Sequence, residues 1–240
     1  MKKLILPVVA ISILSFSSCH TKNTSTPSDT SVADSAAISE VAVDAKYGSP
    51  DLQFKDLKGN VKECSIATYY CDEQGNVADE NNKVNEECFV FDENGMIDLQ
   101  SPKLNWRLLD PIVKRDADRY IVEVKWYISD YDTYVKEQFR YNADHTICQH
   151  INSGIESDDA ETYTYDDNGT LIQSVSKGAG EGSVFRNTIT YTILATDAHD
   201  NWVRRLQKNV CESGPDDGSE TYDESFVEYS LESRTITYWK

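Results

Sequence analysis

The sequence predicts an all-β domain in which one antiparallel sheet is built from tandem β-hairpins with irregular insertions. Three observations predict it: a turn pattern that recurs five times, strand-like runs between its copies, and the lack of any long stretch with helical periodicity. The 240-residue chain is 39% hydrophobic, which is enough for a packed core. We therefore expect residues 50–240 to form a single β-rich domain.

The recurring pattern begins with two apolar residues that are separated by one residue of any type. An Asp or Asn, two polar residues and a position that needs positive φ follow. Its clearest copy is Tyr163–Leu171. The Asp or Asn side chain accepts hydrogen bonds from the backbone ahead of it, and three residues later a glycine lets the chain reverse. The predicted turn-forming pairs are Asp72 and Gly75, Asp92 and Gly95, Asn142 and His145, Asp166 and Gly169, and Asp197 and Asp200.

Two of these copies carry His145 and Asp200 in place of glycine. His and Asp are among the few residues with a side chain that are enriched at positive φ. The two exceptions are therefore compatible with the same turn.

Alternating apolar residues predict strands between the turns. In Tyr120–Ile128 the alternate positions are apolar, and Tyr134–Tyr141 follows across a short loop, so we expect the two runs to pair. Further strand-like runs are Val61–Tyr70, Thr188–Leu194 and Thr235–Trp239. Leu104–Asp116 is the one stretch in which we expect a helical turn or two.

The turn unit resembles the YD repeat of RHS-type proteins, and the chain is similar to bacterial lipoproteins built from such units, over roughly residues 55–205. The resemblance implies antiparallel sheet and says almost nothing about activity. This chain departs from the family in two ways. The basic residue that commonly follows the glycine is replaced in every copy, and five copies are too few to enclose a toxin.

The N-terminus predicts export. Lys2 and Lys3 precede the apolar run Leu4–Ile13, which is too short to span a bilayer stably. Leu14–Cys19 resembles a bacterial lipobox, with Phe16 where leucine is commonest. We expect residues 1–18 to be a lipoprotein signal peptide and Cys19 to be lipidated; the alternative is a plain secretory signal that is cut nearby.

The segment after Cys19 predicts a tether, since residues 19–49 are rich in Ser and Thr and have no lasting apolar period. The expected location is the cell envelope, with the protein exported and lipid-anchored, and the outer membrane is favoured. The sequence assigns neither the periplasmic nor the surface face. The first expected partner is the lipid bilayer, which Cys19 would enter. Nucleic acid is excluded, because the net charge of −18 would repel a phosphate backbone.

The cysteines allow two interpretations. Parity along the strands puts Cys64 and Cys88 on the face opposite the aromatic residues of the turn pattern, where they could form a disulfide. The alternative is that all five remaining cysteines are small core residues. Both interpretations stay open.

The His and carboxylate residues predict no catalytic or metal site and no cofactor. His145, Cys148 and His150 are too few for a zinc site, and we interpret them as a turn histidine, a packed cysteine and a surface histidine. The acidic side chains of the fourth turn region are interpreted as solvated: Asp158, Asp159, Glu161, Asp166 and Asp167.

The expected function is non-catalytic binding of an envelope protein or a glycan by the anchored domain. The 14 tyrosines and four tryptophans include candidates for stacking on sugar rings, although most are expected to pair across strands. Two alternatives stay open: a carboxylate-dependent hydrolase acting on polysaccharide, and a structural or immunity-like partner of a larger RHS-type protein.

Overall fold

A computed structural model describes residues 47–240 except 80–82, 106–110, 155–157, 181 and 218–220. The predicted signal peptide (1–18), Cys19 and most of the tether lie outside the described residues. Tyr47 and Ser49, which the sequence assigned to the tether, are buried. The Tyr47 hydroxyl donates to Asp56 at 3.1 Å, and the Ser49 hydroxyl donates to the Gly95 carbonyl at 2.7 Å. The tether prediction is therefore wrong at this end, because the packed part of the chain already includes Tyr47.

The described residues form one antiparallel sheet of 11 strands, which confirms the predicted all-β class. Its order is β2-β1-β11-β10-β9-β8-β7-β6-β5-β4-β3, so the first hairpin pairs with the last strand. The elements are α1 (Pro50–Phe54), β1 (Val61–Tyr70), β2 (Lys83–Val90), β3 (Ile112–Arg115), β4 (Ile121–Ile128), the short 3-10 turn η1 (Ser129–Tyr131), β5 (Thr133–Tyr141), β6 (Ile147–Ser153), β7 (Asp158–Tyr165), β8 (Leu171–Gly180), β9 (Ser183–Thr196), β10 (Trp202–Pro215) and β11 (Glu224–Tyr238).

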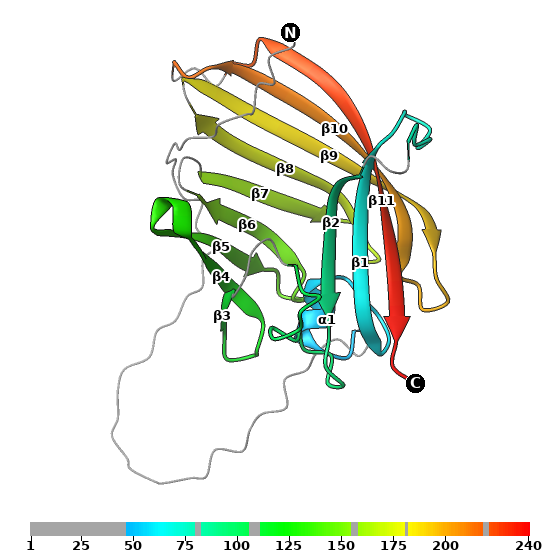
Figure 1. The fold of residues 1–240 in the computed structure, drawn as a ribbon. Coiled ribbons are helices and arrows are strands. Elements are labelled where there is room, and N and C mark those ends of the chain that lie inside the picture. The colour runs from blue at the N-terminus through cyan, green and yellow to red at the C-terminus, as the bar shows by residue number, and fades with distance from the viewer. Residues whose placement is uncertain (1–46, 80–82, 106–110, 155–157, 181, 218–220) are drawn as a thin grey trace, which may run out of the picture.

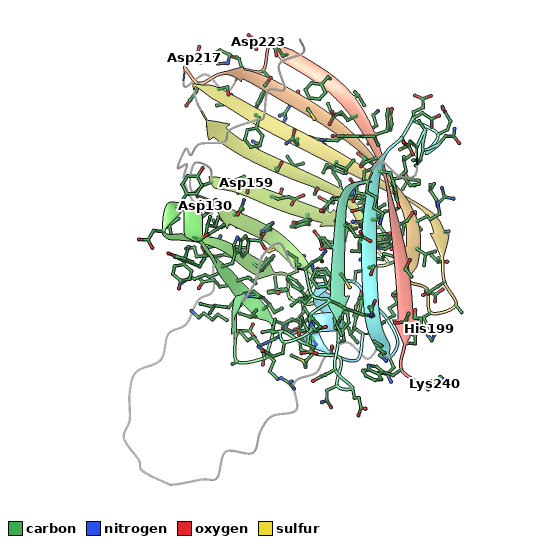
Figure 2. The ribbon with its side chains drawn as sticks, in the orientation of Figure 1. Asp130, Asp159, His199, Asp217, Asp223 and Lys240 are labelled. Atoms are coloured by element: carbon green, nitrogen blue, oxygen red, sulfur yellow. The ribbon has the colours of Figure 1, made fainter. Side chains whose placement is uncertain are left out.

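The sheet is strongly curved, and β1 and β2 lie across its concave side from the middle strands (Figure 1). Side chains gather densely around α1 and thin out toward the end that carries Asp217 and Asp223 (Figure 2). We call the end of the concave side that α1 occupies the closed end. The two ends of the concave side therefore differ in packing.

The five predicted turns share one geometry. In each copy the N–H of the special position donates to the carbonyl of the Asp or Asn three residues earlier, at 2.9–3.2 Å. The φ angle at that position is positive in every copy: 80° at Gly75, 74° at Gly95, 62° at His145, 75° at Gly169 and 60° at Asp200. The backbone geometry therefore agrees with the sequence prediction in all five copies, including the two that lack glycine. The side-chain contact differs in one of them: the Thr146 N–H donates to Asp144 Oδ1, and the Asn142 amide donates to the Thr146 hydroxyl.

A sixth turn of the same form was missed. The Arg119 N–H donates to the Asp116 carbonyl at 3.2 Å, and Arg119 has a φ of 70°. The Asp116 side chain accepts from the Asp118 and Tyr120 N–H groups, as the Asp side chain does in the four predicted copies that contain Asp at this position. The helical turns predicted for Leu104–Asp116 are wrong over Ile112–Arg115, which is strand β3. Arg115 and Arg119 stand where the pattern requires an apolar residue and a glycine, which hid this copy.

The hydrophobic core fills the closed end. Leu52, Phe54 and Leu57 pack there with apolar residues of the outer strands, among them Phe89 and Val124, neither of which is exposed. The short helix begins at Pro50, and the Ser49 side chain caps it by accepting from the Leu52 N–H. One polar group inside this core is paired, since the fully buried Asp51 carboxylate accepts from the Arg115 guanidinium at 2.7 Å.

The disulfide predicted between Cys64 and Cys88 does not form, since both are free thiols. Cys64 pairs with Phe89 across the β1–β2 ladder and Cys88 pairs with Ser65, so the two cysteines face opposite sides of the sheet. Cys64 points into the core and is 1% exposed. The parity argument assumed that the first two turn copies face the same side of the sheet. Cys64 shares a side with Phe89, whereas Tyr69, an odd number of residues along β1, faces the other side, so the assumption was wrong.

Candidate functional site

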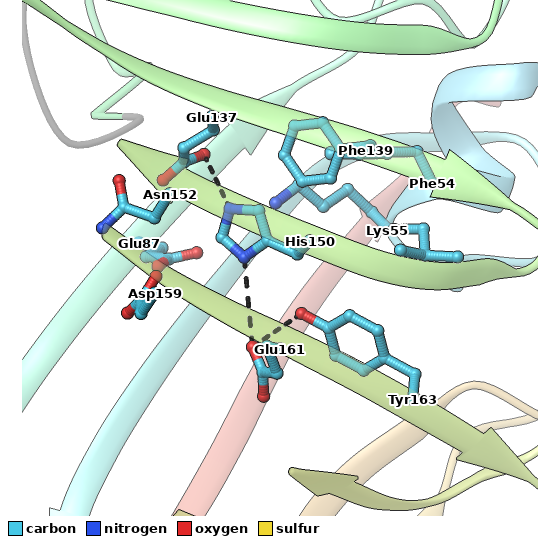
Figure 3. A pocket seen from close by; sticks show the side chains of 11 residues that line it. Phe54, Lys55, Glu87, Glu137, Phe139, His150, Asn152, Asp159, Glu161 and Tyr163 are labelled. Carbon is cyan, nitrogen blue, oxygen red and sulfur yellow. Dashed lines mark hydrogen bonds and ion pairs between the residues drawn. The ribbon is translucent and has the colours of Figure 1, made fainter. Parts of the chain in front are cut away.

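A cavity of about 300 Å³ lies on the concave side, between the chain that follows α1 and strands β5, β6 and β7 (Figure 3). Its lining is polar and aromatic, and consists of Phe54, Lys55, Glu87, Glu137, Phe139, Ile147, His150, Asn152, Asp159, Glu161 and Tyr163. A second cavity of about 270 Å³ shares five of these residues and continues toward β10 and β11. We call the first one the acidic cavity.

Strand register explains why these side chains converge. Phe139, His150 and Glu161 are direct neighbours across β5, β6 and β7, and so are Glu137, Asn152 and Asp159. Direct cross-strand neighbours project from the same face, so two rows of side chains enter the acidic cavity together. Lys55 enters the cavity from the segment directly after α1. The hydrophobic core holds α1, and so Lys55, in place.

His150 stands between two carboxylates at the centre of the site (Figure 3). Its Nε2 lies 3.8 Å from Glu137 Oε2, and its Nδ1 lies 3.9 Å from Glu161 Oε2. These separations suit ion pairing and are too long for hydrogen bonds. The ring is stacked on Phe139 with a centroid distance of 4.8 Å and an interplanar angle of 3°. The stack fixes the orientation of the imidazole.

Glu161 is held as an anion. Its burial opposes ionisation, but the neighbouring His150, Ser174 and Tyr163 favour the charged form and keep the pKa of Glu161 below its ordinary value. The Tyr163 hydroxyl donates to Glu161 Oε2 at 2.7 Å. Burial, with the adjacent Glu161, raises the pKa of Tyr163, so this hydroxyl remains a neutral donor. The cavity wall therefore carries a negative charge at neutral pH.

Charge is unevenly distributed between the two cavities. The acidic cavity has one ammonium, that of Lys55, against four carboxylates: Glu87, Glu137, Asp159 and Glu161. Burial lowers the pKa of Lys55, although Glu87 and Glu137 oppose this effect. The Lys55 Nζ also lies 3.7 Å from the centroid of the Phe89 ring. Lys55 and His150 are two basic groups against four carboxylates, so acidic groups are in excess in this lining.

The second cavity contains the guanidinium groups, and these have partners of their own. Arg234 donates to the Lys55 and Asp56 carbonyls at 2.8 and 3.1 Å, and it stacks 3.5 Å from the centroid of the Trp202 ring. Arg205 is paired with Glu232. Arg234 therefore fastens the chain after α1 to β11, which keeps Lys55 at the boundary of the two cavities.

The predicted turn residues stand apart from the acidic cavity, although one of them, Gly169, lines the second cavity. His145 is stacked on Tyr120 at a centroid distance of 4.3 Å, so it does not join His150. Within the described ranges, no group of three His, Cys, Asp or Glu side chains is arranged to hold a metal.

Three site residues were misread in the sequence. His150 was interpreted as a surface residue but its side chain is only 15% exposed, and Asp159 and Glu161 were interpreted as solvated but line the cavity. Alternation within each strand could have grouped Glu137 with Phe139, and Asp159 with Glu161 and Tyr163. What it could not supply is which face of the sheet is concave.

The comparisons with known proteins assign no function to the chain, so the functional proposal rests on the site. No protein-family model matches the chain, and no curated protein gives a significant match. In the part of the chain that the structure describes, no helix has the length and apolarity needed to cross a membrane.

Proposed function

We propose that the protein is a lipid-anchored component of the cell envelope whose sheet domain binds a glycan in the acidic cavity without catalysing a reaction. The observation that carries the proposal is the convergence of carboxylates, an amide and aromatic rings from β5, β6 and β7 on one half-open cavity. Carboxylate and amide oxygens accept hydrogen bonds from sugar hydroxyls, and the aromatic groups supply apolar surface for sugar rings.

The size of the cavity favours a glycan over a protein surface. A volume of about 300 Å³ lies at the lower end of the range for small-molecule sites. It has room for a short portion of a saccharide chain. A stable protein partner would need about 800 Å² of contact from each side, which a cavity of this size does not offer.

Anchoring is supported by the sequence features before the described residues, namely the lysines, the apolar run and the lipobox-like segment that ends at Cys19. The RHS-type resemblance adds a hairpin scaffold that can carry such a site. A Cys19→Ser variant should lose fatty-acid labelling and partition into the soluble fraction. Labelling that survives this substitution would contradict the anchor.

The hydrolase alternative has one observation in its favour, the presence of Glu137 and Glu161 on opposite sides of the same imidazole. A glycosidase needs a general acid whose pKa is raised. The pKa of Glu161 is lowered, which suits an acceptor of hydrogen bonds and not a proton donor. Binding therefore explains this carboxylate better than hydrolysis does.

A glycan array probed with the full chain tests the proposal. The wild-type protein and a Glu86→Gln variant, which changes an exposed carboxylate on β2, should bind the same glycans. A Glu161→Gln variant should bind them at least about tenfold more weakly, because it loses a charge-assisted acceptor. An array without any bound glycan would contradict the proposed function, and sugar release from a bound glycan would favour the hydrolase.

A further inference from the structure

We infer that the acidic cavity selects saccharides that carry a protonated amine, such as glucosamine units, over their acetylated and hydroxylated counterparts. This inference rests on the proposed glycan-binding function and adds the chemical class of the ligand. The first support is charge: among the described residues, four carboxylates line the cavity with one ammonium and one imidazole, so the acidic groups outnumber the basic ones by four to two. A cationic group would offset part of that excess.

The second support is an unsatisfied acceptor. The Asn152 Oδ1 atom is buried and has no hydrogen-bond partner, although it projects from β6 between Glu137 and Asp159 in the register. A buried acceptor without a donor costs free energy, and a rotation of the Asn152 amide toward the cavity would let a ligand N–H recover it. An ammonium offers three donors, and a sugar hydroxyl offers one. The unpaired Asn152 oxygen is therefore a second argument for a ligand with several N–H donors, separate from the charge of the lining.

The third support is that the negative charge persists in a poorly solvated space. Glu161 accepts from the Tyr163 hydroxyl at 2.7 Å, and its pKa lies below the ordinary value. The Glu137 side chain is only 4% exposed. Attraction between opposite charges strengthens as water is excluded, so a bound ammonium gains more here than it would at the protein surface.

The arginines of the second cavity do not remove this preference. Arg205 is paired with Glu232, and Arg234 donates to the Lys55 and Asp56 carbonyls. The Arg205 charge is balanced by Glu232. Among the described residues the Arg234 charge is not paired with a carboxylate, but Arg234 lines the second cavity and not the acidic one. The acidic cavity keeps its excess of carboxylates.

A matched ligand series tests the inference with the unmodified full chain. Calorimetry would compare β-1,4-linked tetrasaccharides of glucosamine, N-acetylglucosamine and glucose, which differ only at C2, at a pH at which the amine is protonated. The glucosamine oligomer should bind at least about tenfold more tightly than either of the others. Added salt should reduce that difference.

Two neighbouring carboxylates on β2 provide the matched variants. Glu87 lines both cavities, whereas the adjacent Glu86 is exposed and forms an ion pair with Lys83. Glu87→Gln should reduce the preference for the amine several-fold, and Glu86→Gln should leave it unchanged. Glu161→Gln should reduce it at least as much as Glu87→Gln, and thermal melts would show whether each variant is folded.

The outcomes separate the inference from the proposed function. Equal affinity for all three tetrasaccharides would overturn the amine preference and leave glycan binding intact. No binding of any of the three would also overturn the inference, and the wider array would then decide on glycan binding itself. A preference that persists in both Glu87→Gln and Glu161→Gln would place the amine outside the acidic cavity and overturn the assignment.

Discussion

The concave side of the sheet has two regions in which side chains alternate in the same way. One region forms the hydrophobic core, and the other lines the acidic cavity. At the closed end, the inward residues of β4 include Val124 and Trp126, which belong to the hydrophobic core around α1. On β6 and β7, the inward residues include His150 and Glu161, which line a cavity. The backbone pattern is the same in both regions. The comparison teaches that period-two alternation specifies a face, while side-chain chemistry decides whether that face becomes core or site.

The largest expected effect separates the two regions by stability. Phe89→Ala at the closed end should reduce the free energy of unfolding by about 3–5 kcal/mol, because it removes a fully buried ring from the core. Asn152→Ala in the cavity should change it by less than about 1 kcal/mol, since its buried Oδ1 has no partner to lose. Denaturant unfolding of the two variants measures the difference. Similar losses would contradict the division into core and site.

The next effect concerns the turns that build both regions. Gly169→Val should destabilise the protein by about 1–2 kcal/mol, because a β-branched residue is strained at a φ of 75°. Arg119→Gly, at a φ of 70° in the sixth turn, should instead raise the melting temperature. A melting temperature unchanged by both substitutions would contradict the shared turn geometry.

The smallest effect sharpens the comparison through pH. The pKa of Glu161 is lower in the folded protein than its ordinary value, so its ionised form stabilises the fold above the unfolded-state pKa. This contribution is lost as the pH falls through the folded-state pKa. Glu161→Gln should therefore flatten the acid side of the stability profile. Glu86→Gln serves as the control and should keep the wild-type slope.

The turns and strands could be predicted because their causes are local. The Asp-to-glycine spacing identified five reversals, and the run Val61–Tyr70 coincides with β1. The sixth turn escaped because Arg119 occupies a position where glycine was expected. The same region contains Arg115, whose partner Asp51 lies 64 residues away. Such a pair has no local signature.

The site could not be predicted because its causes are long-range. The cavity needs the curvature of the whole sheet and the pairing of β1 with β11, which joins the two ends of the domain. A register shift is a second long-range cause. Ile147 and His150 both line the cavity although they are three residues apart, because the β5–β6 ladder shifts between Arg140 and Tyr141. Strict alternation from Ile147 would have turned His150 to the opposite face.

The most direct test is the NMR response of the histidine side chains to a glycan that binds. His150 lies in the acidic cavity, whereas His145 is stacked on Tyr120 and His199 contacts Tyr238. The imidazole resonances of His150 should shift on titration, while those of His145 and His199 stay in place. Shifts of His145 or His199 with an unchanged His150 would contradict binding in this cavity.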